Sequence, residues 1–185
     1  EWDGMIPALV SRKFDAIIAS MSITDERKSK VDFTEKYYAS PLALIAKKGS
    51  PLRPDLESLK GRKVGVQRGT VSDNFATKYW DGKGMQIVRY AKQDEAYLDL
   101  RAGRLDAAFS DYLEAYGGFL TKPEGEGYDV AGERLFGKTA EEKAVIGEGI
   151  GIAVRKRDKE LTAKLNQALA AIRANGKYDA IQKKY

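Results

Sequence analysis

Apolar positions along this chain follow two different spacings, and the two alternate. Short apolar runs bounded by glycine, proline or polar residues are typical of strands buried in a sheet, and they occupy residues 14–19, 64–67, 86–90 and 105–109. Apolar residues three or four positions apart predict amphipathic helices, and they occupy residues 3–12, 56–60, 71–81, 93–101 and 111–120. Because strands and helices alternate, we predict an α/β fold.

Two extended segments, residues 38–47 and 148–153, enclose the middle of the chain. The chain therefore leaves one lobe, builds a second lobe and returns to the first. We predict a first lobe from residues 1–40 and 149–185 and a second lobe from residues 41–148, joined by two strands. Such a nested layout favours a cleft between the lobes.

The last part of the chain predicts an extended segment followed by two helices. Glycines in the extended segment, at Gly147, Gly149 and Gly151, predict local flexibility. One long helix carries its apolar residues on one face, at Leu161, Leu165, Leu169 and Ile172. The pair Asn175-Gly176 is a helix-ending signal, and a short helix is expected at 177–184.

Composition excludes several classes of chemistry. The 185 residues contain neither cysteine nor histidine, which removes disulfides, thiol catalysis, Ser-His triads and the commonest transition-metal ligands. We therefore expect neither an enzyme nor a cofactor or metal site. No apolar run approaches the roughly 18 residues that indicate a membrane span. No signal peptide is visible, because the sequence opens at Glu1-Trp2-Asp3 directly into the pattern of a folded protein. This absence does not indicate the location of the protein, because secreted chains lose their signal peptides.

The net charge of +5 does not indicate a nucleic-acid partner. Basic and acidic residues alternate along most of the predicted helices, and basic runs with interleaved aromatic residues are missing from the sequence. The pair Lys183-Lys184 ends the last helix, where cations favour the helix dipole. A solvated surface of mixed charge is the favoured interpretation.

The segment from Asp15 to Arg27 carries the first candidate site. Its apolar run ends in small hydroxyl residues, and Arg27 follows five positions after Ser22. Ligands of open α/β sheets bind beyond the carboxyl ends of strands, and a guanidinium matches a carboxylate in a bidentate pair. These residues alone are compatible with two interpretations, an anion-binding site and a solvated turn.

Three further features could take part in binding. The turn Gly69-Thr70 leads into a helix whose free N–H groups attract anions, although a plain structural turn explains it as well. Asp111 ends an apolar strand, where it could bind an ammonium group or cap the next helix. Trp2 could cover the apolar or cationic part of a ligand, and core packing is equally compatible with its position.

Taken together, these residues resemble the periplasmic solute-binding proteins for polar amino acids. The resemblance is strongest to the lysine/arginine/ornithine- and histidine-binding group of ABC importers, and it extends over essentially the whole chain. The matching stretches are 2–9, Asp15 to Arg27, 31–34 with Tyr37-Tyr38, 59–70, 102–107 and Gly147 to Arg155. The resemblance implies a two-lobed type II periplasmic binding protein fold with a two-strand hinge.

The resemblance also assigns roles to individual residues. Arg27 would bind the α-carboxylate of an amino acid, helped by Ser22 and by the backbone at Thr70 and Val71. Asp111 would take the α-ammonium together with the Ser20 region, and Trp2 would stack on the ligand side chain. Arg68 and Ser72 would lie near the cleft. The full implied set of ligand-binding positions is Trp2, Ala19, Ser20, Met21, Ser22, Arg27, Gln67, Thr70, Val71, Ser72 and Asp111.

Two departures from the family pattern bear on the ligand. Family members usually carry a serine where this chain has Ala19, which widens the pocket and leaves opine-type arginine conjugates open as ligands. The family also has further residues before the position of Glu1, including acidic residues that select a basic side chain. We therefore expect a first lobe without its N-terminal strands and helix. It would be destabilised or completed by another chain or segment, unless the sequence record is incomplete.

The resemblance implies a periplasmic protein that captures arginine, lysine, ornithine or histidine and delivers it to the membrane permease of an ABC importer. It would be a monomer unless another chain completes the first lobe. Two alternatives share the fold. A cyclohexadienyl-dehydratase-like enzyme would need a proton donor, for which Asp111 and Glu148 are the candidates. A receptor ligand-binding module would be part of a longer chain.

Overall fold

The computed structural model describes residues 1–184, and the chain divides into two units. Unit 1 consists of Glu1–Met5 and Ser40–Glu148, and unit 2 consists of Ile6–Ala39 and the residues from Gly149 onward. The first five residues belong to unit 1, whereas the sequence-based division assigns residues 1–40 to one lobe. A local contact explains the difference, because the indole nitrogen of Trp2 donates a hydrogen bond to the carbonyl oxygen of Gly69 at 3.1 Å.

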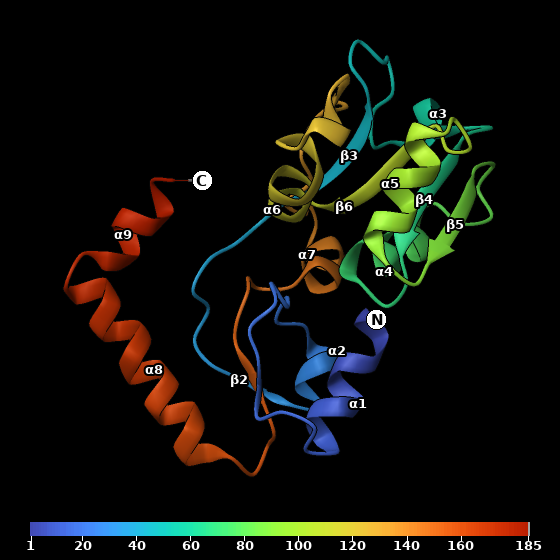
Figure 1. Cartoon of the computed structure of the whole chain (residues 1–185). Helices are drawn as coiled ribbons and strands as arrows, with labels where there is room; N and C mark the ends of the chain where they lie inside the picture. The colour runs from blue at the N-terminus through green and yellow to red at the C-terminus, as the bar shows by residue number, and fades with distance from the viewer. Residues whose placement is uncertain (185) are drawn as a thin grey trace. The chain divides into compact units, whose positions relative to one another are not determined.

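Unit 1 is built on a mixed β-sheet with the strand order β5-β4-β6-β3-β7 (Figure 1). The strands are β3 (Leu42–Lys47), β4 (Lys63–Gln67), β5 (Gln86–Tyr90), β6 (Ala107–Asp111) and β7 (Tyr128–Val130). Strand β4 pairs in parallel with β5 and β6, and β3 pairs antiparallel with β6 and β7. In the register of β3 and β6, Leu42 lies opposite Asp111.

Helices pack against both faces of this sheet, because alternate residues of each strand point to opposite faces. In β6, Phe109 belongs to one buried cluster and Ala108 to the other. The helices are α3 (Leu56–Leu59), α4 (Val71–Tyr79), α5 (Gln93–Arg101), α6 (Tyr112–Ala115) and α7 (Ala140–Ile146). A π-helical turn, Tyr116–Leu120, continues α6.

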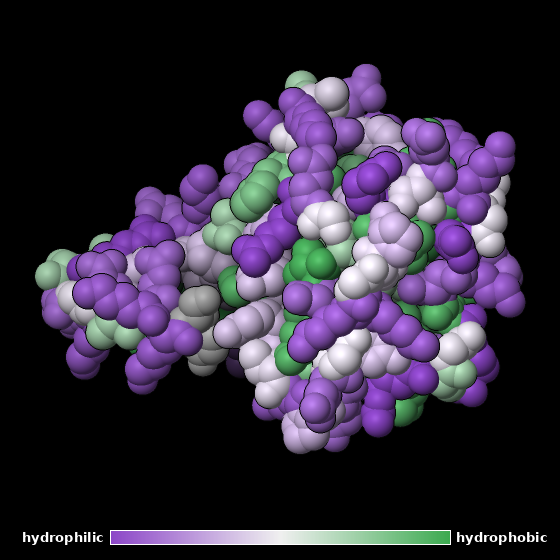
Figure 2. All heavy atoms as spheres, turned by 90° about the horizontal axis from the view of Figure 1, so that it is seen from above, coloured by the Kyte–Doolittle hydropathy of each residue, from purple (hydrophilic) through white to green (hydrophobic). Residues whose placement is uncertain are grey.

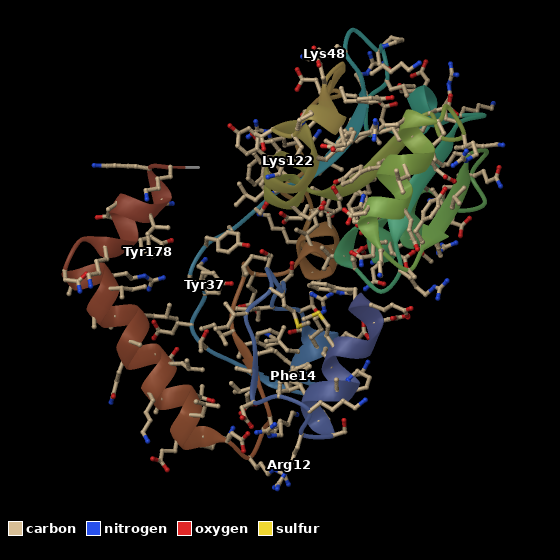
Figure 3. All side chains as sticks on the ribbon, viewed as in Figure 1. Arg12, Phe14, Tyr37, Lys48, Lys122 and Tyr178 are labelled. Atoms are coloured by element: carbon tan, nitrogen blue, oxygen red, sulfur yellow. The ribbon has the colours of Figure 1, made fainter. Side chains whose placement is uncertain are left out.

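Unit 2 contains a smaller antiparallel sheet in the order β1-β8-β2, formed by β1 (Ala16–Ile17), β2 (Asp32–Phe33) and β8 (Ala153–Val154). Its helices are α1 (Met5–Val10, which starts in unit 1), α2 (Asp25–Lys28), α8 (Lys159–Ala174) and α9 (Lys177–Gln182). The hydroxyl of Tyr178 on α9 donates to the carbonyl oxygen of Tyr37, and both residues are labelled in Figure 3. This contact ties the last helix to the segment that follows β2.

Most elements predicted from the sequence are present, with shifted ends. Strand β6 ends at Asp111, two residues later than predicted, because antiparallel pairing with β3 extends it. The strand predicted at 14–19 is reduced to Ala16–Ile17. The hydrophobic spacing does not predict β2, β7 or α2, which have at most four residues each. It also does not predict α7, whose first turn is acidic.

The glycines of the returning segment serve close packing as well as backbone freedom. A β-carbon on Gly151 would lie 2.9 Å from Cδ1 of Ile23. Gly149 has φ of 137°, a conformation that other residues rarely adopt. The flexibility expected from these glycines is therefore better described as a steric requirement, because residues 149–151 are also hydrogen-bonded to Ile23, Met21 and Tyr38.

Within residues 1–184, no helix is both long and apolar enough to cross a membrane. The same residues contain no cluster of acidic side chains that could hold a metal ion. Hydrophilic side chains cover most of the face in view in Figure 2.

Replacing Phe109 with alanine should destabilise unit 1 by about 3–5 kcal/mol, the usual cost of removing a buried phenyl ring. Phe109 is fully buried, with its ring centre 4.5 Å from that of Trp80. Urea unfolding followed by tryptophan fluorescence measures the effect. Phe136→Ala is the matched control because Phe136 is 66% exposed, and it should change the unfolding free energy by no more than about 0.5 kcal/mol. Equal losses in the two variants would contradict the assignment of the core.

Candidate functional site

Unit 2 holds a buried guanidinium beside the end of β1. Thr24 caps α2 by accepting a hydrogen bond from the Arg27 amide at 3.3 Å. Arg27 lies in this single helical turn and is only 6% exposed. Its Nη1 donates to the carbonyl oxygen of Ser22 at 3.0 Å. Local chain geometry therefore fixes the guanidinium next to the hydroxyl residues that precede it.

Burial makes the charge of Arg27 costly. Desolvation lowers the pKa of Arg27 from its usual value to about 10, against the opposing effect of neighbouring Glu26. An opposite charge brought close to a desolvated cation favours its charged form. A small anion, such as a carboxylate, would therefore offset the cost of burying this guanidinium.

The turn before Arg27 is held in an unusual conformation. Ser20 has φ of 55°, in the left-handed region that residues other than glycine seldom occupy. The hydroxyl of Tyr38 donates to Oγ of Ser20. Burial raises the pKa of the neighbouring Tyr37, whose side chain also interacts with the Ser20 backbone. Ser22 and Tyr38 each form a bridge with Ile150, so the returning segment supports the turn.

Unit 1 holds the start of α4, where Thr70 is the helix cap. The Thr70 hydroxyl accepts from the amide of Asp73 at 3.2 Å and contacts Oγ of Ser72 at 2.7 Å. The amide of Gly69 donates to Oδ2 of Asp73 at 3.0 Å. The N–H groups of Val71 and Ser72 belong to the first helical turn, which contains no acceptors for them within the helix. This end of α4 can therefore receive an anion.

Asp111 ends β6 and begins α6. Its Oδ1 accepts from the amides of Leu113 at 2.9 Å and Glu114 at 3.1 Å, so the carboxylate caps the helix. Burial raises the pKa of Asp111 above its usual value, although these hydrogen bonds and one involving Ser40 oppose the shift. The capping role proposed from the sequence is thus present. A nearby ammonium would in addition stabilise the ionised form.

A second acidic residue, Glu114, was not predicted from the sequence as a site residue. It lies in the first turn of α6, and the hydroxyl of Tyr97 donates to its Oε2 at 2.7 Å. Burial raises the pKa of Glu114 to about 7, and the charge of Asp111 acts in the same direction. Its position three residues after a candidate site aspartate was the available signal, but this spacing is also common on solvated helices.

The predicted site residues divide between the two units. Unit 2 contains Ala19, Ser20, Met21, Ser22 and Arg27, and unit 1 contains Trp2, Gln67, Thr70, Val71, Ser72 and Asp111. Not all of their side chains are available to a ligand. Met21 is 1% exposed, and the side-chain amide of Gln67 donates to the carbonyl oxygen of Ala91 at 3.1 Å. For these two positions, backbone or packing roles agree better with the structure than direct side-chain contacts.

Each unit carries charged or polar groups that could bind a small charged molecule. Unit 2 offers a buried cation at Arg27, and unit 1 offers a desolvated carboxylate at Asp111 with a helix start at Thr70. An α/β framework that carries such groups is compatible with a protein that binds a small charged solute.

The chain belongs to the bacterial extracellular solute-binding proteins, family 3, whose profile matches residues 1–185. It is 49% identical to the L-arginine-binding protein of Pseudomonas aeruginosa over the whole chain and 70% of that relative. It is 46% identical to the lysine/arginine/ornithine-binding periplasmic protein of Escherichia coli, covering 69% of that protein.

Solved structures agree with the family assignment. An ancestral arginine-binding protein bound to arginine aligns with a TM-score of 0.85 and 38% identity, over all of this chain and 76% of that chain. A Salmonella typhimurium periplasmic binding protein with high arginine specificity aligns with a TM-score of 0.83 and 32% identity, over all of this chain and 77% of that chain. The predicted family and fold are therefore confirmed, and the relatives are binding proteins rather than enzymes.

Replacing Asp111 separates its capping role from its charge. Asn keeps a capping acceptor, whereas Ala removes it, so Asp111→Ala should be less stable than Asp111→Asn by about 1 kcal/mol. When the pKa of a carboxyl group is higher in the folded state than in the unfolded state, the folded protein loses stability as the pH rises above the pKa of the unfolded state. Asp111→Asn should therefore be at least as stable as the parent chain at pH 7. Urea unfolding without ligand measures both differences, and an Ala variant as stable as Asn would contradict the capping role.

Proposed function

We propose that this protein binds a basic L-amino acid, with arginine as the first candidate and lysine, ornithine and histidine as the others. The observation that carries the proposal is the buried guanidinium of Arg27 in a chain whose relatives include arginine-, lysine/arginine/ornithine- and histidine-binding proteins. Every amino acid carries a carboxylate that can pair with this group.

Arg27 binds the α-carboxylate in this proposal. A guanidinium donates two parallel hydrogen bonds to a carboxylate, and the backbone N–H groups of Val71 and Ser72 supply further donors from unit 1. Thr70 orders that helix start as its cap. The cost of burying Arg27, expressed in its lowered pKa, is offset when the ligand carboxylate arrives.

Asp111 binds the α-ammonium, and its carboxylate is held in place by α6. Trp2 covers the ligand side chain, and its indole is oriented by the hydrogen bond to Gly69. Ala19 leaves room where a larger side chain would restrict the ligand.

We further propose that the protein works in the periplasm and passes its ligand to the membrane permease of an ABC importer. The relatives that are named as periplasmic binding proteins support this location. In this proposal the protein binds its solute without changing it chemically. The bound solute must then be released to a transport pathway, which implies the permease as the partner.

Arg27→Ala should weaken arginine binding by about 2–5 kcal/mol, because a buried carboxylate then loses its charged partner. Isothermal titration calorimetry with arginine, lysine, ornithine and histidine measures the loss. Arg157→Ala is the matched control in unit 2, since the Arg157 side chain is 57% exposed. A circular dichroism melt of each variant without ligand shows whether the fold is retained. Unchanged affinity for all four amino acids in a folded Arg27→Ala variant would disprove the role of Arg27.

Asp111→Asn tests the other half of the site. The variant keeps the helix cap but loses the charge that pairs with an ammonium, so arginine affinity should fall at least roughly thirty-fold. The comparison of titrations with L-arginine and with agmatine, which lacks the α-carboxylate, separates the two charges. Asp111→Asn should weaken both ligands, whereas Arg27→Ala should weaken L-arginine far more than agmatine. The opposite pattern would reverse the two assignments.

A further inference from the structure

A cluster of hydrogen-bonded side chains adjoins Asp111 in unit 1. It consists of Tyr97 on α5, Ser110 on β6 and Glu114 on α6. The Tyr97 hydroxyl donates to Oε2 of Glu114 at 2.7 Å and contacts Oγ of Ser110 at 3.1 Å. Tyr97 and Ser110 are each 3% exposed. Glu114 is partly exposed, so the cluster joins two buried groups to a carboxyl group that solvent can reach.

The fold holds this cluster rigidly. The Tyr97 ring stacks on Phe119 with ring centres 4.3 Å apart and an angle of 6° between the ring planes. The amide of Glu114 donates to Oδ1 of Asp111 at 3.1 Å, so the two acidic residues share the first turn of one helix. This hydrogen bond fixes the backbone of Glu114 at Asp111, and the Tyr97 hydroxyl orients the Glu114 carboxyl group.

The charged groups that act most on Glu114 are both acidic. Asp111 faces it from the end of β6, and Asp94 faces it from α5. Burial and these two charges raise the pKa of Glu114 to about 7, while the hydrogen bonds from Tyr97 and Ser110 lower it. Burial and the charge of Glu114 in turn raise the pKa of Tyr97, so Tyr97 stays a proton donor at neutral pH.

We propose that Glu114 is a second acidic residue of the amino-acid site, positioned by Tyr97 and Ser110, which releases a proton when a cationic ammonium binds at Asp111. This inference rests on the proposed function, because it requires the ammonium to bind at Asp111. Without ligand, the charge of Asp111 disfavours the ionised form of Glu114, so Glu114 is largely protonated below pH 7. A bound ammonium compensates the charge of Asp111, which lowers the cost of ionising Glu114, and the Glu114 proton leaves to solvent.

The sign of the pH effect follows from this exchange. A ligand that favours ionised Glu114 lowers its pKa, so binding releases protons and the affinity rises with pH. A fall of about one pKa unit from about 7 on binding would strengthen affinity roughly five-fold between pH 6 and 8. About half a proton would be released per bound ligand near pH 6.5.

Calorimetry of L-arginine binding at pH 6.5, in two buffers that differ in ionisation enthalpy, counts the released protons. L-Arginine is the suitable probe because its guanidinium does not titrate in this range. The parent chain should release about half a proton more than Glu114→Gln, which keeps an acceptor for Tyr97 but cannot ionise. Glu126→Gln, at an exposed position of unit 1, should behave like the parent. Any proton release from Asp111 itself also occurs in Glu114→Gln, so it cancels when the proton release of the two proteins is subtracted.

Tyr97→Phe provides a second test that does not remove the carboxylate. Its phenyl ring keeps the stacking on Phe119, but the hydrogen bond that lowers the pKa of Glu114 is lost, so the midpoint of the pH dependence should move upward. A midpoint that stays in place would overturn the assignment of the release to this cluster. Arginine binding with equal proton release in the parent and Glu114→Gln would overturn this inference alone, whereas no binding of any basic amino acid would overturn the proposed function.

Discussion

The pairing of β3 with β6 is the constraint on which unit 1 depends. It places Leu42 opposite Asp111, so that the strand entering the unit lies beside the strand that ends in the site aspartate. Strand β6 also pairs with β4, whose end leads into the capped start of α4. Strand β6 therefore fixes the positions of Asp111 and of the start of α4 in this unit. The buried residues of β6 contribute to the core on both faces of the sheet.

The charged residues of the site are costly to the fold that carries them. Arg27 has a lowered pKa because it is buried, and Asp111 and Glu114 have raised values for the same reason. Neutral residues at these positions would avoid this desolvation penalty. In the proposed site, a charged ligand would remove part of this penalty on binding, and this would link stability to affinity.

The elements with a clear hydrophobic pattern were predictable, whereas several of the short ones were not. Residues 71–81 and 93–101 have clear helical spacing, and α4 and α5 lie there. The five-residue strands β4 and β5 follow apolar runs between turn signals. In contrast, α2 has only four residues, and its position depends on the Thr24 cap and the burial of Arg27. Such a turn gives no periodic signal, because its stability comes from tertiary contacts.

The sequence by itself determined the α/β class, the family and the residue types that can bind a zwitterion, since these depend on spacing and on the side chains present. Only the tertiary structure decided which of those side chains are buried. It enclosed Met21 and turned the Gln67 amide toward Ala91. It also brought Tyr97, far earlier in the chain, onto Glu114. Desolvation and hydrogen bonding between distant residues depend on packing in three dimensions, which local spacing does not encode.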